Sequence, residues 1–127
     1  MVKYMEVLLD TNFIISCVMK RIDFLSLLEE MGFKVKVPRE VLQELKDVKR
    51  GKKVSRLEKE AIDIAFEILE AGKTKKMKLG GKNVDEGLIA KGKEGFFIAT
   101  LDRGIKVKVK NKVVIDNSRK GIKILRD

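Results

Sequence analysis

Short apolar segments alternate with amphipathic segments along almost the whole chain, and this alternation limits the possible folds more than any other feature. Residues 5–9 are a short apolar stretch typical of a strand, and residues 12–21 then carry apolar side chains at helical spacing. Similar strand-helix pairs recur further along the chain. Strands that are apolar on both sides need helices over both faces of their sheet. The pattern therefore predicts an α/β fold, a three-layer sandwich with a central, mainly parallel sheet flanked by helices.

The remaining elements follow from capping residues, glycine breaks and periodicity. Helices are predicted at 23–31, 38–48, 55–72 and 83–93, and strands at 34–37, 74–79, 96–100, 113–115 and 122–125. Segment 49–53, Lys-Arg-Gly-Lys-Lys, is predicted to be a basic loop. Residues 105–110 alternate apolar residues with lysine, which indicates a strand, and a short helix fits equally well. No linker or repeat divides the sequence, so residues 1–127 are predicted to form a single domain.

Histidine is absent from the 127 residues, and Cys17 is the only cysteine. The absence of histidine excludes a Ser-His-Asp triad, a Cys-His pair, an imidazole base and the common histidine-containing zinc sites. The lone cysteine excludes an internal disulfide and a cysteine zinc cluster, and its apolar neighbours predict a core position. Any catalysis must therefore use carboxylates, lysines, hydroxyls or a metal held by oxygen ligands.

The charge balance is strongly basic, with 29 Lys and Arg against 19 Asp and Glu and a net charge of +10. Such a charge attracts polyanions, with nucleic acid as the first expectation and an anionic membrane surface as the alternative. No apolar run reaches the roughly 18 residues of a membrane span, and no signal-peptide pattern opens the chain, which predicts a cytoplasmic protein outside the membrane.

Basic clusters at 49–53, 73–78 and 106–112 contain no interleaved acids, so we expect at least one to follow a phosphate backbone, although solvated surface is an open alternative. The candidate nucleic-acid contacts are Arg50, Lys52, Lys53, Lys75, Lys76, Arg103 and Lys106. Four phenylalanines fall on apolar faces and are predicted to be core residues rather than base-stacking platforms. These are Phe13, Phe66, Phe96 and Phe97.

Acidic residues stand at several places where predicted strands and helices meet. Asp10 and Asp102 each follow a strand, while Asp85 lies in the first turn of one helix and Glu44 lies on another. Loops at the carboxyl ends of parallel strands converge on one crevice, so these carboxylates are predicted to meet. Crowded carboxylates repel unless a cation neutralises them, and oxygen ligands favour Mg²⁺ or Mn²⁺ over zinc. A divalent metal beside a basic surface indicates phosphodiester hydrolysis by an activated water.

Each of these acids also has an ordinary structural explanation when it is taken alone. Asp10 could cap the helix that follows it, and Glu44 could face solvent. Asp85 could complement the helix dipole, and Asp102 could shape a turn. The prediction of a metal site therefore rests on the combination of the four.

Four segments resemble, in chain order, the signature blocks of PIN-domain ribonucleases, and these are LLDTNFII, VPREVLQEL, NVDEGLIAKG and FFIATLDRGIKVK. The resemblance covers nearly the whole chain and implies a PIN-like fold and an Mg²⁺- or Mn²⁺-dependent endoribonuclease. It implies a quartet of catalytic, metal-binding residues, namely Asp10, Glu44, Asp85 and Asp102. It also implies that Asn12 and Thr100 are auxiliary neighbours that orient ligands or water. Glu86 and Asp116 could assist or substitute.

The leading prediction is hydrolysis of RNA to 5′-phosphate and 3′-hydroxyl ends, because the attacking group is a metal-activated water and not the RNA 2′-hydroxyl. The resemblance covers both VapC-type toxins and ribosomal-RNA processing proteins. The partners that it implies are RNA, a cognate antitoxin in the first case, and a second copy in a homodimer.

Two other functions remain open from the residues. One is a non-catalytic RNA-binding or ribosome-assembly module that uses the basic surface. The other is a receiver-like domain phosphorylated on an aspartate, which the acids Asp85 and Asp102 and the basic surface disfavour.

Overall fold

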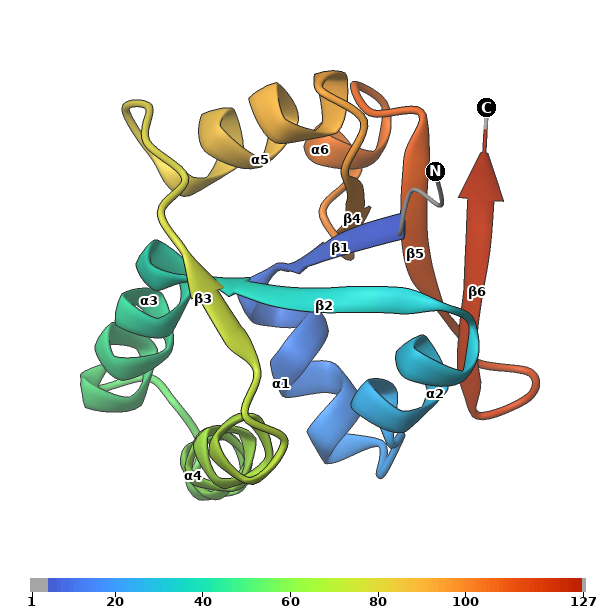
Figure 1. Cartoon of the computed structure of the whole chain (residues 1–127). Helices are drawn as coiled ribbons and strands as arrows, with labels where there is room; N and C mark the ends of the chain where they lie inside the picture. The colour runs from blue at the N-terminus through green and yellow to red at the C-terminus, as the bar shows by residue number, and fades with distance from the viewer. Residues whose placement is uncertain (1–4, 127) are drawn as a thin grey trace.

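Six strands form one sheet in the order β3-β2-β1-β4-β5-β6 in the computed structural model, which describes residues 5–126 (Figure 1). The strands are β1 (Met5–Leu9), β2 (Phe33–Pro38), β3 (Lys75–Met77), β4 (Phe97–Ala99), β5 (Asn111–Asp116) and β6 (Gly121–Arg126). Neighbouring strands from β3 to β5 pair in parallel, and β6 alone runs antiparallel, beside β5. The predicted mainly parallel sheet is confirmed.

Helices cover both faces of this sheet, which confirms the predicted three-layer sandwich. They are α1 (Thr11–Met19), α2 (Phe24–Glu30), α3 (Arg39–Arg50), α4 (Arg56–Ala71), α5 (Val84–Lys93) and α6 (Arg103–Lys106). Helices α1 to α4 lie on one side of the sheet, and α5 and α6 lie on the other (Figure 1). The side chains of β1 alternate accordingly: Val7 and Leu9 belong to the larger core and Leu8 to the smaller one, and all three are fully buried.

Predicted caps begin three of the helices. Asp23 accepts a hydrogen bond from the backbone N–H of Ser26 and starts α2. Ser55 accepts the N–H of Glu58 at the start of α4, and Asn83 accepts the N–H of Glu86 at the start of α5. Each cap satisfies a backbone donor that the first turn of a helix leaves without an intrahelical partner.

The structure corrects three of the predicted elements. Helix α3 continues to Arg50, so the first two of the five residues in the predicted basic loop 49–53 are helical. Lysine and arginine are good helix formers and complement the dipole at a helix C-terminus. Pro38 is the last residue of β2 and precedes the helix instead of opening it. In segment 105–110 the strand is wrong and the short-helix alternative is right, because Ile105 and Val109 both pack into the core beneath α5.

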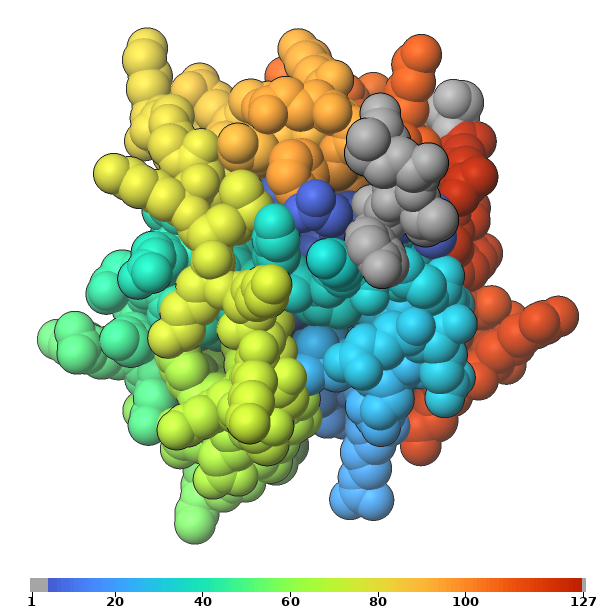
Figure 2. Space-filling model, in the orientation of Figure 1, coloured from blue at the N-terminus to red at the C-terminus, as the bar shows by residue number. Residues whose placement is uncertain are grey.

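Burial divides the phenylalanines that were predicted to be core residues. Phe13 and Phe97 are buried, whereas Phe66 and Phe96 pack against the core from partly exposed positions. Cys17 is fully buried, as predicted. In the space-filling view the yellow β3 segment lies at the surface against the teal residues of β2 (Figure 2). Over residues 5–126, no helix combines the length and apolar character needed to cross a membrane.

Candidate active site

The strand order reverses between β1 and β4, because the chain leaves β1 for β2 on one side and reaches β4 on the other. In an open α/β sheet the loops diverge at such a point and leave a crevice at the carboxyl ends of the strands. Asp10 directly follows β1, and its N–H donates to the carbonyl of Ala99, the last residue of β4, at 2.9 Å. The crevice therefore opens where two predicted site segments lie side by side.

A cleft of about 480 Å³ occupies this position. Eight residues line it, namely Asp10, Thr11, Asn12, Glu44, Asp47, Val48, Asp85 and Asp102. The structure thus brings together all four acids of the predicted quartet, which come from the β1-α1 junction, α3, α5 and the β4-α6 junction. Asn12 also lines the cleft, as an exposed residue in the first turn of α1.

Among the acids of the cleft, Asp10 is the buried one, with 7% of its surface exposed. Its Oδ1 accepts the backbone N–H of Thr11 at 2.8 Å, and its Oδ2 accepts the hydroxyl of Thr100 at 2.7 Å. Burial raises the pKa of the Asp10 carboxyl above its usual value, the two hydrogen bonds oppose that rise, and the charges of Glu44 and Asp85 add to it. Asp10 therefore caps α1 and also feels the negative charge of the other acids.

Thr100 is fully buried and does not itself line the cleft. Besides donating to Asp10, its Oγ1 accepts the backbone N–H of Asp102 at 3.0 Å. The Oδ1 of Asp102 in turn accepts the N–H of Ile105 at 3.0 Å and caps α6. Thr100 therefore holds Asp10 and the start of the Asp102 turn in one arrangement, so it acts by positioning other residues.

Helix α3 contributes Glu44 and, one turn later, Asp47. The hydroxyl of Thr11 donates to Oε1 of Glu44 and so ties α3 to the β1-α1 junction. Sequence reasoning missed both Thr11 and Asp47. The spacing of three residues between Glu44 and Asp47 could have indicated Asp47, because residues so spaced share a helix face. No sequence signal separates Thr11 from an ordinary first-turn threonine.

Asp85 is exposed in the first turn of α5, and the adjacent Glu86 points elsewhere, because it lines a different depression together with Lys93 and Lys108. Asp116 ends β5, and its Oδ1 accepts the N–H and the hydroxyl of Ser118 at 3.1 and 2.7 Å. Neither Glu86 nor Asp116 lines the acidic cleft.

Glu40, at the start of α3, fixes the loop that leads into α5. Its carboxylate accepts the backbone N–H groups of Leu79 and Gly80 at 3.0 to 3.1 Å. Burial opposes ionisation of Glu40, but these N–H groups outweigh it and hold its pKa below the usual value. Gly87 lets the same loop approach α5, since a Cβ there would lie 2.9 Å from the Gly80 carbonyl oxygen. These contacts set where α5 places Asp85.

None of the seven predicted basic contacts lines the cleft. Arg103 follows Asp102 directly, and the other six lie at the end of α3 and the turn after it, on β3 and at the end of α6. Lys112 corrects the predicted basic cluster 106–112: it is buried instead of lying at the surface, and its Nζ donates to the carbonyls of Lys106 and Val109 at 3.0 and 2.9 Å. That ammonium stabilises the C-terminal end of α6.

The donor set of the cleft fits a hard divalent cation, because carboxylate and amide oxygens are the ligands that Mg²⁺ and Mn²⁺ prefer. Within residues 5–126, no group of three or more acidic or cysteine side chains is arranged so that it could already hold an ion. The carboxylates of Asp10, Glu44 and Asp102 are instead directed to protein donors. Binding would require rotations of the side chains at the mouth of the cleft.

The sequence matches the PIN-domain family model over residues 7–115, so the chain belongs to the PIN-domain family. That membership supports a nuclease of the PIN type, and PIN-domain nucleases in general use divalent metal ions. No curated protein sequence matches the chain.

Among solved structures, the PIN domain endonuclease Utp24 superimposes with a TM-score of 0.71 at 19% sequence identity. The match covers 96% of this chain and 92% of that chain. It confirms a PIN-like fold for this protein.

Proposed function

We propose that this protein is a divalent-metal-dependent endoribonuclease whose catalytic residues are Asp10, Glu44, Asp85 and Asp102. The observation that supports it best is the common cleft of these four acids, which come from segments far apart in the sequence. A chain with a net charge of +10 gains no obvious stability from concentrating carboxylates at one point, whereas a cation-dependent phosphodiesterase needs them there.

The residues would divide the work according to their burial. Asp10, which is buried and held by Thr11 and Thr100, would be the fixed ligand of a Mg²⁺ or Mn²⁺ ion. Glu44, Asp85 and Asp102 would complete the ligand set from the more exposed walls of the cleft. When bound, such an ion activates water and stabilises charge on the phosphate.

Three further side chains would support the reaction. The exposed amide of Asn12 would orient a water or a phosphate oxygen at the mouth of the cleft. Thr100 would keep Asp10 in place without touching substrate. Arg103, which follows Asp102, is suited to hold the backbone of the RNA beside the cleft. Attack by water predicts products with a 5′-phosphate and a 3′-hydroxyl.

Two neighbouring residues provide a matched test. Asp85→Asn removes a charge from the cleft, whereas Glu86→Gln removes one charge from the next residue, outside the cleft. We expect Asp85→Asn to lower cleavage of a labelled mixed RNA pool in Mg²⁺ or Mn²⁺ more than about 100-fold, since even the outer partners of metal ligands contribute 10- to 100-fold. Glu86→Gln should cleave at nearly the wild-type rate.

Chelation and the chemistry of the ends complete the test. Excess EDTA should abolish cleavage, and restoring Mn²⁺ should recover it. Substituting 2′-O-methyl nucleotides should leave the type of end unchanged where cleavage persists. If cleavage continues in EDTA, or if both variants behave alike, the proposed site is wrong. RNA binding without any cleavage in Mn²⁺ would instead support the non-catalytic alternative.

The family match leaves open whether this chain acts as a toxin or in RNA processing, so the cognate antitoxin, the homodimer and cytoplasmic residence stay predictions. An antitoxin would have to present a basic group to the acidic cleft to neutralise it.

A further inference from the structure

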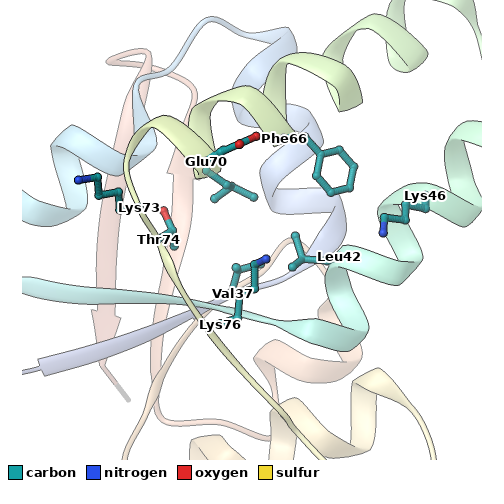
Figure 3. A pocket seen from close by; sticks show the side chains of 9 residues that line it. Val37, Leu42, Lys46, Phe66, Glu70, Lys73, Thr74 and Lys76 are labelled. Atoms are coloured by element: carbon teal, nitrogen blue, oxygen red, sulfur yellow. The ribbon is translucent and has the colours of Figure 1, made fainter.

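Figure 3 shows a second pocket, of about 530 Å³. Leu42 and Lys46 of α3 line it, and they lie on a different side of that helix from Glu44 and Asp47, which line the acidic cleft. Its floor is apolar and consists of Val37, Leu42, Phe66 and Leu69. Its rim is polar and consists of Lys46, Glu70, Lys73, Thr74 and Lys76. The volume lies within the range of roughly 300 to 1,000 Å³ that is common for small-ligand sites.

We propose that this pocket binds one nucleotide of the RNA whose neighbouring segment lies in the acidic cleft. The base would stack on Phe66 and pair through its Watson–Crick edge with Glu70, and the adjoining phosphates would contact the lysines. The inference rests on the proposed function, because it assigns a base-recognition subsite to that same substrate.

Phe66 supplies the stacking surface. It lies on α4, is only partly buried, and faces the pocket opposite Leu42 (Figure 3). An aromatic ring that covers one side of an open apolar pocket is the arrangement on which unpaired bases stack. Phe66 therefore has part of its ring accessible within the pocket, whereas Phe13 and Phe97 are buried.

The charges of the rim favour a nucleotide with its phosphates. Three lysines and one carboxylate line the rim, and among residues 5–126 no ion pair joins Glu70 to Lys46, Lys73 or Lys76. Lys76 rises from β3 toward the pocket while Lys46 approaches from α3 (Figure 3). The lysines suit the phosphates, and the carboxylate accepts N–H groups.

Glu70 also indicates which base fits. A carboxylate with two acceptor oxygens matches an edge that presents two adjacent N–H donors. Guanine offers such a pair on its Watson–Crick edge, whereas uracil offers a single N–H between two carbonyl oxygens. We therefore expect guanine to be preferred over uracil at this position.

Helix α3 connects the pocket to the cleft. Glu44 and Asp47 line the cleft, and Leu42 and Lys46 line the pocket, so the two sites are separated by one helix. An α-helix with its side chains is about 10–12 Å across, which a strand of a few nucleotides can span.

The pocket continues on its other side into a smaller depression of about 230 Å³. The two share Lys73 and Thr74, and the depression adds Lys34, Lys36 and Lys75 together with the acid Glu29. Lys36 forms an ion pair with Glu6 at 2.6 Å, so Lys73 and Lys75 are the lysines that we expect to contact an RNA backbone leaving the pocket. This gives the lysines of β3, which lie outside the acidic cleft, a place on the RNA path.

An acidic amphipathic peptide is the competing occupant. A peptide helix anchors itself by several apolar side chains in a long groove. Here the partly exposed apolar surface is confined to the neighbourhood of Phe66 and Leu42, with lysines on both sides. The geometry therefore favours a single inserted ring over a helix.

The test measures RNA binding by fluorescence anisotropy in EDTA, so that no cleavage is needed. The probes are a short oligouridine and the same oligonucleotide with one guanosine at successive positions. The wild-type protein should bind the best guanosine probe about tenfold more tightly than oligouridine. Phe66→Leu, which retains apolar volume, should weaken binding of that probe about tenfold, and Glu70→Gln should abolish the preference for guanosine.

The matched control is Glu67→Gln, which removes an exposed charge from the same helix outside the pocket and should change neither affinity nor preference. Lys76→Gln should weaken both probes alike and reduce the salt dependence of binding. Equal binding of both probes by the wild type, or no effect of Phe66→Leu, overturns the proposal. Phe66-dependent binding of an acidic amphipathic peptide together with Phe66-independent RNA binding overturns it in favour of a protein partner.

The readout separates this proposal from the proposed function. Asp85→Asn should retain the guanosine preference in EDTA, and Phe66→Leu should raise the RNA concentration needed for half-maximal cleavage in Mn²⁺. A wild-type protein that prefers the guanosine probe but shows no metal-dependent cleavage would refute the catalytic site alone. A wild-type protein that cleaves RNA in Mn²⁺ but shows no guanosine preference would refute the pocket alone.

Discussion

The hydroxyl of Thr100 links two of the four acids, and Thr100→Val removes it while keeping the shape of the side chain. The valine deletes the hydrogen bond to Asp10 Oδ2 and leaves the N–H of Asp102 without its acceptor. A hydrogen bond to a charged group contributes about 1.5–3 kcal/mol, and a neutral one about 1 kcal/mol. Because Thr100 is fully buried, water cannot replace either bond, and we expect a loss of about 2–4 kcal/mol.

The pH dependence of this loss follows from the pKa of Asp10. Burial raises that pKa and the Thr100 hydroxyl opposes the rise, so the valine variant should raise it further. A carboxyl with a raised folded-state pKa binds more protons in the folded than in the unfolded protein. Stability therefore falls as pH rises through the folded-state pKa. The difference between Thr100→Val and wild type should be larger at pH 7 than near pH 4.

Urea unfolding at the two pH values measures both effects. With a slope of about 1–3 kcal/mol per molar urea, the midpoint at pH 7 should fall by roughly 1–2 M. Thr100→Ser keeps the hydroxyl and loses one methyl group, so its free energy of unfolding should fall by only about 1 kcal/mol. Its difference from wild type should be the same at both pH values. If serine and valine destabilise equally at both pH values, the hydroxyl does not support Asp10 and the reasoning fails.

Two further predictions concern the packing. Burial raises the pKa of the Cys17 thiol to about 12, with Lys20 opposing the rise. Iodoacetamide at pH 8 should therefore label the unfolded protein but not the folded protein. Rapid labelling of the folded protein would contradict this prediction. In Gly92→Ala the new Cβ would lie 2.4 Å from Cγ1 of Val109, and we expect a net loss of about 1–2 kcal/mol in thermal unfolding despite the better helix propensity of alanine. Restored stability in the double variant with Val109→Ala would support the clash, and an unchanged midpoint in Gly92→Ala would contradict it.

Interactions between residues close together in the sequence made most of the fold predictable. The caps at Asp23, Ser55 and Asn83 act within three residues, and the apolar strands have only one way to be covered. The prediction failed where the sequence pattern fitted a strand and a helix equally well. Residues 105–110 alternate like a strand, but the spacing of Ile105 and Val109 also suits a helical turn, and burial under α5 decided between them.

The sequence predicted the residues of the candidate site that follow strands or stand in the four motif segments. Asp10 and Asp102 follow strands, and the parallel topology brings strand ends to one edge. Thr11 was missed because its contact with Glu44 joins residues 33 positions apart. For Asp10 and Asp102, a local structural role and a position in the candidate site are compatible, since both carboxylates cap helices and also line the cleft.

The sequence by itself determined the layers of the sandwich, the chemical classes that the absence of histidine excludes, and the four candidate acids, because these depend on residue type, short-range periodicity and motif order. Only the tertiary structure decided that Asp47 joins the cleft, that Glu86 and Asp116 do not, and that Phe66 is partly exposed in a pocket that lysines of α3 and β3 also line. The physical reason is that a sequence pattern fixes which face of an element a side chain occupies. What lies opposite that face depends on how distant elements pack.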